Sequence, residues 1–182
     1  MSEGLITMQR LIMELSAIPH EGISQRYSST GIALGIAAAE LSVVQPVEIA
    51  CHFYKGDHEV VVQGSLRSAA RLPCSRCAEE FEQPLSVALD AVYLPTHEIS
   101  SERAKELEEE EADVYPFAEQ VIDIAEMVRD KLLLSISLQP HCMVECKGLC
   151  PSCGVNRNVV SCQCAKEKLG APFEPLKGLR FS

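Results

Sequence analysis

Cysteines are the residues of this 182-residue chain whose type and spacing most clearly indicate chemistry. Eight of the nine cysteines form four close pairs along the sequence. A tetrahedral zinc ion takes four thiolate ligands, so four pairs can supply two complete sites. We therefore expect zinc as the cofactor, held by the following residues: Cys74, Cys77, Cys142, Cys146, Cys150, Cys153, Cys162 and Cys164.

The strongest local motif is Cys150-Pro-Ser-Cys153-Gly154. In a turn of this type, backbone N–H groups point at the two sulfurs, and the Cys-x₂-Cys spacing lets both bind one ion without strain. Pro after the first cysteine favours the turn, and Gly after the second permits a positive φ at its exit. The motif predicts a zinc-binding turn.

The grouping of the pairs into sites is open from the sequence. Either Cys162/Cys164 or Cys142/Cys146 could complete the site of Cys150 and Cys153, and His141 could replace a neighbouring cysteine. If Cys162/Cys164 complete it, Cys142/Cys146 are free to meet Cys74/Cys77 and close a loop of about 65 residues, which would restrict the unfolded chain. The alternative is a single C-terminal site, with Cys74 and Cys77 reduced.

Two catalytic interpretations compete with structural metal binding. Cys74-x-x-Cys77 could be a redox dithiol, but that chemistry favours a cysteine at a helix N-terminus, whereas this pair lies between strand patterns. A catalytic zinc keeps an open coordination position, which four thiolates do not leave. We expect no enzymatic activity. Cys51 alternates inward on a strand and is interpreted as a small buried apolar residue.

Composition limits the classes of partner and the location. The net charge of −10 argues against non-specific nucleic-acid binding, which depends on Lys and Arg neutralising phosphates. The C-terminal end is locally basic, so direct RNA binding there is an alternative, through Lys147, Arg157, Lys166 and Lys168. The N-terminus lacks the pattern of a secretory leader, and the longest apolar run, 31–44, is too short to span a bilayer. We expect a cytoplasmic protein without membrane or small-molecule partners.

The elements that must position these cysteines are mostly strands. We predict a first strand over 11–18 and a possible helix over 32–41. Alternating apolar residues then predict a strand after Pro46, a hairpin into 59–71, and a third strand that ends at Pro95. Cys74 and Cys77 would lie at the tip of the connection between the last two. A helix should follow, with Asp123 as N-cap, Glu126 as its capping-box partner, and one face formed by Ile124, Met127, Val128 and Leu132.

The expected fold class is α+β: an antiparallel sheet, as a meander or partly closed barrel, with one main helix and a C-terminal Cys-rich zinc-binding module. We divide the chain into an α+β domain over 1–140, which includes an acidic loop at 96–113, the zinc-binding module over 141–166, and a tail over 167–182. The acidic loop is interpreted as disordered or loosely helical.

Three motifs resemble those of the YceD-like family, or large ribosomal RNA subunit accumulation proteins. They are the segment around Cys74-Ser-Arg-Cys77, the helix pattern over 122–134, and Cys142-(x₃)-Cys-Lys-Gly-Leu-Cys-Pro-Ser-Cys-Gly-Val-Asn156. The resemblance runs from about residue 45 to the end. It departs from the family pattern at Arg157, where a leucine is usual, and in the tail, which lacks the common Asp-Pro-Arg.

This resemblance implies a bacterial or plastid protein needed for accumulation of large-subunit (23S) ribosomal RNA, without an established enzymatic activity. Genes of the family often lie beside that of a small zinc-binding ribosomal protein. Because the chain is acidic, we favour an adaptor to a ribosomal protein or a ribosome-assembly factor. The alternatives are the direct RNA-binding module and a thiol oxidoreductase at Cys74/Cys77.

Overall fold

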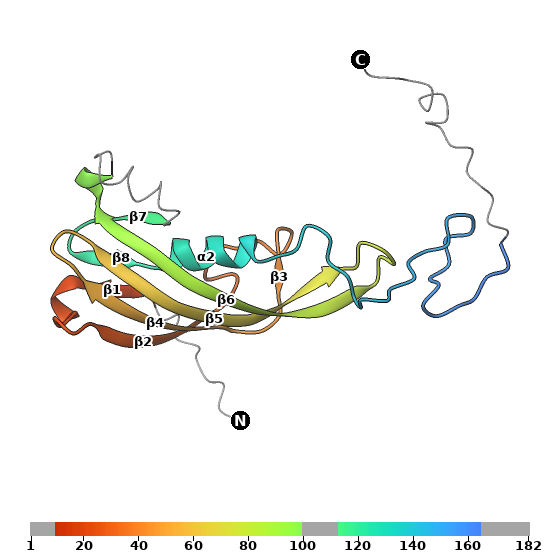
Figure 1. Ribbon diagram of the computed structural model, residues 1–182, viewed down its shortest axis with the longest axis horizontal. Helices are drawn as coiled ribbons and strands as arrows, with labels where there is room; N and C mark the ends of the chain where they lie inside the picture. The colour runs from red at the N-terminus through yellow and green to blue at the C-terminus, as the bar shows by residue number, and fades with distance from the viewer. Residues whose placement is uncertain (1–9, 100–112, 165–182) are drawn as a thin grey trace, which may run out of the picture.

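The computed structural model describes residues 10–99 and 113–164 (Figure 1). Most of the predicted acidic loop and the whole predicted tail therefore lie outside the described residues. The strands are β1 (Ile12–Glu14), β2 (Ile23–Ser29), β3 (Ser42–Val43), β4 (Val47–Lys55), β5 (Val60–Pro73), β6 (Glu80–Pro95), β7 (Val114–Phe117) and β8 (Val121–Asp123). The helices are α2 (Ala125–Leu134) and two short 3₁₀ turns, η1 (Leu15–Ala17) and η2 (Thr96–Glu98).

Most strands belong to one open six-stranded sheet. Its order is β2-β4-β5-β6-β7, with β3 paired to β5 off this path. The pairs from β2 to β6 are antiparallel, as the predicted meander requires. The sheet has two outer strands, β2 and β7, so it is not a closed barrel. A separate two-stranded antiparallel sheet pairs β1 with β8.

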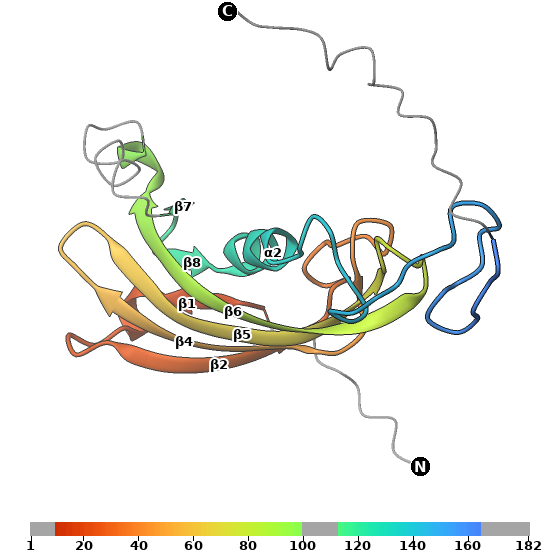
Figure 2. The same ribbon diagram turned by 45° about the vertical axis from the view of Figure 1, so that its right-hand side comes forward.

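The sheet curves around the helix. Figures 1 and 2 show β4, β5 and β6 bending as a long arc, with α2 on the concave side. The helix contacts β6 and supplies a fully apolar face, with Ile124, Met127, Val128 and Leu132 all 0% exposed. This is the predicted helix face. Its burial against the sheet stabilises the fold, at roughly 1.5–3 kcal/mol for each fully buried large apolar side chain.

Strand β4 shows the predicted alternation. Val47, Ile49, Cys51 and Phe53 point into the core, and each is 4% exposed or less. Burial raises the pKa of the Cys51 thiol to about 12, so it stays protonated. Its interpretation as a small apolar core residue is consistent with that environment.

The head of α2 differs in detail from the predicted capping box. The Asp123 carboxylate accepts a hydrogen bond from the Ala125 N–H at 2.9 Å, as a capping side chain does. The helix itself begins at Ala125 with Ile124 as the N-cap residue, so Glu126 lies in the first turn, one position earlier than a capping box needs. Asp123 still supplies a negative charge at the positive end of the helix.

Three predictions about the fold are wrong. The strand predicted over 11–18 is extended only over Ile12–Glu14 and then becomes η1. The possible helix over 32–41 is instead a series of turns, because Gly35 has φ of +70°. The sheet is mixed and not wholly antiparallel, since β7 runs parallel to β6. A parallel neighbour needs a long connection, and the chain from η2 to Asp113 provides it.

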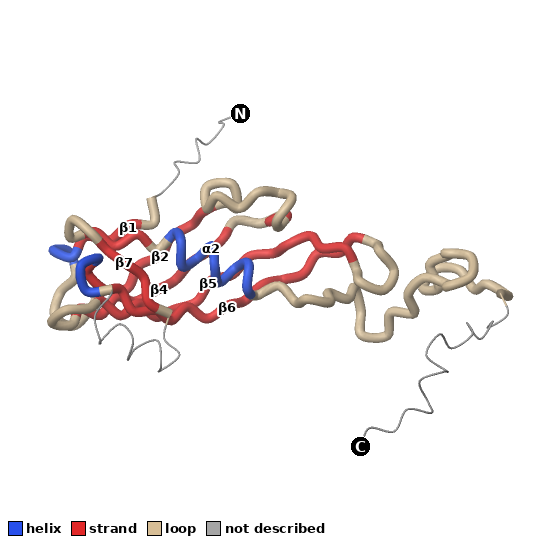
Figure 3. Tube along the Cα trace, turned by 90° about the horizontal axis from the view of Figure 1, so that it is seen from above, coloured by secondary structure: helices blue, strands red, loops and turns tan. Residues whose placement is uncertain are grey.

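The β5–β6 hairpin reaches beyond the rest of the sheet. Its last paired residues are Pro73 and Glu80, whereas β3 and β4 reach β5 no further than Arg71. Figure 3 shows the hairpin extending past α2 toward the loops of the C-terminal segment. The turn that contains Cys74 and Cys77 is therefore held at the far end of a two-stranded arm.

Candidate metal centres

The first group of thiols, called here the hairpin cluster, consists of Cys74, Cys77, Cys142 and Cys146. The first two come from the turn between β5 and β6, and the others from the segment that follows α2. Their sulfur atoms all lie within 4.8 Å of one another. Cys74, Cys77 and Cys146 are buried, and Cys142 is partly buried.

Sulfur-to-sulfur distances in this cluster fit a tetrahedral ion. The Sγ atoms of Cys74 and Cys146 are 3.8 Å apart, and those of Cys77 and Cys142 are 3.7 Å apart. Four sulfurs placed about 2.3 Å from a central zinc lie about 3.8 Å from one another, from the geometry of a tetrahedron. A disulfide would instead need about 2.05 Å. The donor set therefore has the size of a four-thiolate metal site.

Backbone hydrogen bonds connect the hairpin turn to the C-terminal segment. Ser75 N–H donates to the Pro140 carbonyl at 2.8 Å, and Leu149 N–H donates to the Arg76 carbonyl at 3.0 Å. The Arg76 guanidinium donates to the Cys146 carbonyl at 3.0 Å. Chain segments about 70 residues apart in sequence are thus joined on both sides of the cluster.

The second group, called here the C-terminal cluster, consists of Cys150, Cys153, Cys162 and Cys164, again with all sulfurs within 4.8 Å of one another. Its ligands all come from a single 15-residue stretch of loop. Cys150 is buried and Cys162 partly buried, whereas Cys153 and Cys164 are exposed. Figure 1 shows this stretch, in blue, projecting beyond the hairpin arm.

These two groups are the ones predicted from the sequence for two zinc sites. Cys142/Cys146 meet Cys74/Cys77, and Cys162/Cys164 meet Cys150/Cys153. His141 is exposed and belongs to neither group. Each group therefore consists of four cysteines and no histidine. Each set is closed, because four thiolates satisfy a tetrahedral ion and leave no position for a substrate.

Both Cys-x₂-Cys motifs form the same turn. In the hairpin cluster, Ala78 N–H donates to the Cys74 carbonyl at 2.9 Å, and Ala78 has φ of 60°. In the C-terminal cluster, Gly154 N–H donates to the Cys150 carbonyl at 2.8 Å, with φ of 74°. The residue after the second cysteine is left-handed in both turns, but only one of the two turns has the glycine that this conformation favours.

The first cysteine of each turn is the thiol most ready to ionise. Burial opposes ionisation of Cys74, but hydrogen bonds from the backbone N–H groups of Cys142, Cys77 and Arg76 outweigh it and lower its pKa to about 5. N–H groups of Cys153 and Ser152 likewise lower the pKa of Cys150 to about 6. The turns therefore stabilise a thiolate, which is the form that binds metal.

Two of the other thiols, Cys142 and Cys164, have raised pKa values. Burial raises the pKa of Cys142 to about 12, with further contributions from the neighbouring thiols. The hydrogen bond with Cys153 is the largest cause that raises the pKa of Cys164 to about 12. A divalent ion reverses this balance, since its charge favours all four thiolates at once.

A low pKa at Cys74 also suits a redox dithiol, so the burial of the two sulfurs and the type of turn distinguish the two roles. Cys74 and Cys77 are each 3% exposed, and both sulfurs face Cys142 and Cys146. Their turn joins two strands and does not begin a helix. These features give an attacking disulfide little access, and they favour metal binding over thiol exchange.

Sequence reasoning missed three polar residues around the clusters. Arg76 N–H lies 3.5 Å from the Cys74 sulfur, and Asn158 Nδ2 donates to the Cys146 sulfur at 3.2 Å. Asn156 Nδ2 lies 3.5 Å from a carboxylate oxygen of Glu79. Arg76 could have been noticed inside the Cys-x₂-Cys motif, but no spacing rule connects Asn158 to a cysteine 12 residues earlier.

Of the four basic residues proposed for RNA contact, the structure describes two. Lys147 and Arg157 are both exposed. They lie on adjacent segments, since Arg157 N–H donates to the Gly148 carbonyl at 2.9 Å. Lys166 and Lys168 lie outside the described residues.

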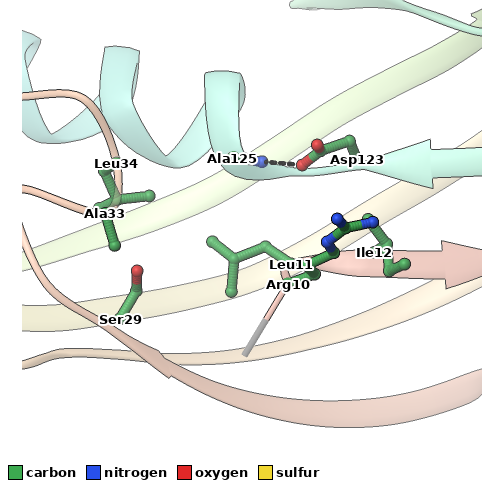
Figure 4. Close-up of a pocket in the computed structure, with 8 residues that line it drawn as sticks. All are labelled: Arg10, Leu11, Ile12, Ser29, Ala33, Leu34, Asp123 and Ala125. Atoms are coloured by element: carbon green, nitrogen blue, oxygen red, sulfur yellow. Dashed lines mark hydrogen bonds between the residues drawn. The ribbon is translucent and has the colours of Figure 1, made fainter. Parts of the chain in front are cut away.

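A separate hollow of about 270 Å³ lies at the head of α2 (Figure 4). Its polar lining residues are Arg10, Ser29 and Asp123, and the rest of the described lining is apolar or alanine. Asp123 is already bonded to the Ala125 N–H, as Figure 4 shows. No histidine, cysteine or lysine is among the described residues that line the hollow. Over the described ranges, no helix has the length and apolar composition that crossing a bilayer requires.

Comparison with known proteins gives a family match that includes both clusters. The family model described as large ribosomal RNA subunit accumulation protein YceD matches residues 62–180. The match begins within β5, later than the start near residue 45 that the sequence motifs suggested. No solved structure matches the chain significantly.

Curated relatives come from plants and from mycobacteria. A chloroplastic protein of Arabidopsis thaliana, described as large ribosomal RNA subunit accumulation protein YCED homolog 1, is 25% identical over 98% of this chain. Its counterpart in Zea mays is 40% identical over 36% of the chain, and an uncharacterized protein of Mycobacterium tuberculosis is 28% identical over 53% of it.

The chain spans 61% of the length of the Arabidopsis relative, 22% of the Zea mays protein and 44% of the mycobacterial one. The family model, by contrast, covers well over half of this chain, from β5 through both cysteine clusters. On that match, the chain belongs to the YceD family of large ribosomal RNA subunit accumulation proteins.

Proposed function

We propose that this chain is a non-catalytic, zinc-binding factor that supports accumulation of large-subunit (23S) ribosomal RNA in the cytoplasm. The observation that carries the proposal is the family match over residues 62–180, which contains every ligand of the two thiol clusters. The name of the Arabidopsis relative refers to the same process.

Zinc is the ion that the donor sets favour. Tetrahedral four-sulfur sites in proteins hold zinc or iron, and zinc is the usual choice where the site is structural. A bound zinc ion in each cluster would hold the hairpin turn and the C-terminal loop in fixed positions. Its role would be structural, since each closed set leaves no coordination position for a reaction.

An adaptor to a ribosomal protein or assembly factor is the mode of action that we favour. Near the clusters, Leu138 is 101% exposed and Val144 is 91% exposed. In the proposed adaptor these two side chains would contact the partner protein. The net charge of −10 also favours a protein partner over a nucleic-acid phosphate backbone.

A deletion and complementation experiment tests this function. In the organism that encodes the chain, loss of its gene should lower 23S ribosomal RNA relative to 16S, and the wild-type gene should restore the ratio. A Cys74→Ser/Cys77→Ser variant should fail to restore it. Cys51→Ala, which removes a thiol outside both clusters, is the matched control and should restore it. An unchanged ratio in the deletion strain would reject the proposal.

Direct RNA binding is the second candidate, favoured by one observation. Lys147 and Arg157 are exposed on adjacent segments beside the hairpin cluster. If they neutralise phosphates, affinity for fragments of large-subunit RNA should fall steeply with salt, and Lys147→Ala/Arg157→Ala should reduce the slope by about 2. Binding with no salt dependence, or no binding at low salt, removes this candidate.

A further inference from the structure

The loop that completes the C-terminal cluster also contacts the hairpin cluster. After Cys153 the chain turns back on itself, with Cys150 N–H bonded to the Val155 carbonyl at 2.9 Å. A β-bridge joins Leu149 to Asn156. This return brings Cys162 and Cys164 to their partners, and it also lays Asn156 and the residues after it against the segment that carries Cys146.

Asn158 is fixed in this loop by both ends of its amide. Its side-chain Oδ1 accepts the Lys147 backbone N–H at 2.7 Å, and the backbone N–H of Asn158 donates to the Asn156 Oδ1 at 3.0 Å. Because a backbone N–H can only donate, the Lys147 contact requires the amide oxygen on that side. The amide nitrogen therefore faces Asn156 Oδ1 at 2.9 Å and the Cys146 sulfur at 3.2 Å.

An N–H group aimed at a ligand sulfur affects metal binding. Four thiolates around one divalent ion leave about two negative charges on the site, which N–H···S bonds partly neutralise. Loss of such an outer contact typically costs about 10- to 100-fold in metal affinity.

We infer that Asn158 is a positioning residue through which the folded C-terminal cluster increases the metal affinity of the hairpin cluster. The inference rests on the proposed occupancy of both clusters by zinc. Metal at Cys150, Cys153, Cys162 and Cys164 closes the loop, the closed loop orients Asn158, and Asn158 donates its amide N–H to the Cys146 sulfur. By linkage, metal in the hairpin cluster favours the closed loop to the same extent, so the two sites fill cooperatively.

Zinc titration of the full chain against a chromophoric chelator tests this coupling. The wild type should bind two zinc ions. Asn158→Ala should still bind two, but the hairpin cluster should bind about 10- to 100-fold more weakly. Val159→Ala is the matched control, since its side chain is 79% exposed in the same loop, and both affinities should stay at the wild-type values. Differential alkylation with mass spectrometry assigns each affinity to its cysteines.

A double-mutant comparison separates coupling from a general loss of folding. Cys162→Ser/Cys164→Ser should lower the zinc affinity of the hairpin cluster by a similar factor. Adding Asn158→Ala to this variant should lower that affinity little further. An unchanged hairpin affinity in Asn158→Ala, or additive losses in the combined variant, overturns the inference. Zinc binding that is independent at the two clusters would reject only the coupling, whereas a wild type that binds no zinc would reject the occupancy as well.

Discussion

The hairpin cluster and the C-terminal cluster contain the same turn in different surroundings. Both use a Cys-x₂-Cys motif whose next residue is left-handed, and both lower the pKa of the first thiol. The hairpin cluster buries three of its four cysteines and joins segments 65 or more residues apart. The C-terminal cluster draws its ligands from 15 residues and exposes two of them.

This difference separates a local motif from its effect on the fold. A metal ion in the hairpin cluster would close a long loop that includes β6 and α2, so it would restrict the unfolded chain of the whole body. An ion in the C-terminal cluster would order only its own loop and what the loop contacts. We therefore expect equal chemistry at the two sites but unequal effects on stability.

The largest effect should follow removal of the hairpin ligands. Cys74→Ser/Cys77→Ser should bind one zinc ion in place of two and lose about 4 kcal/mol of unfolding free energy, from the loop-closure cost of about 65 residues. Metal content by mass spectrometry and denaturant unfolding monitored by circular dichroism measure both. A variant with one ion but wild-type stability would show that the cluster does not hold the body together.

Removal of C-terminal ligands should have a smaller effect. Cys162→Ser/Cys164→Ser should also lose one zinc ion, but only about 1–3 kcal/mol, which corresponds to a 10- to 100-fold weaker hairpin cluster at fixed free zinc. The same two measurements apply. A loss as large as that of the hairpin variant would contradict the contrast between the two regions.

Two glycines should sharpen the contrast further. Gly148 has φ of 68°, and a Cβ there would lie 3.0 Å from the Arg76 carbonyl oxygen in the hairpin turn. Gly154 has φ of 74°, but a Cβ there would meet nothing within 4 Å. Gly148→Ala should therefore cost about 2 kcal/mol and Gly154→Ala only about 0.5 kcal/mol, since a left-handed alanine costs about 1 kcal/mol and the smaller freedom of alanine in the unfolded chain offsets roughly half of that.

These costs are measured by thermal unfolding and by chelator competition on the zinc-loaded protein, since about 1.4 kcal/mol corresponds to a tenfold change in affinity. Equal costs at both positions would mean that the contact with Arg76 relaxes without strain.

The smallest effect concerns Ala78, which occupies in the hairpin turn the position that Gly154 has in the other. A left-handed alanine costs about 1 kcal/mol, of which the greater freedom of glycine in the unfolded chain cancels roughly half. Ala78→Gly should therefore stabilise the protein by about 0.5 kcal/mol and raise Tm by about 1–2 °C. A lowered Tm would show that the Ala78 methyl group makes a contact that favours the present residue.

Much of the β meander was predictable from period-two alternation, as Val47, Ile49, Cys51 and Phe53 illustrate. The face of α2 followed from its spacing in the same way. The turns over 31–40 and the parallel strand β7 were not predictable from pattern. The first depends on a backbone torsion at Gly35, and the second on a partner that the chain reaches only after a long connection.

The amino-acid sequence alone determined which side chains of this protein could hold a metal ion. Thiol pairs at ligand spacing and a glycine after Cys153 are local features, and local geometry restricts what they can bind. Only the tertiary structure decided which pairs meet, because that depends on where a 14-residue strand and its partner carry the hairpin turn. The contact of Asn158 with Cys146 also depends on the tertiary structure, since a hydrogen bond between two loops produces no periodic pattern in the sequence.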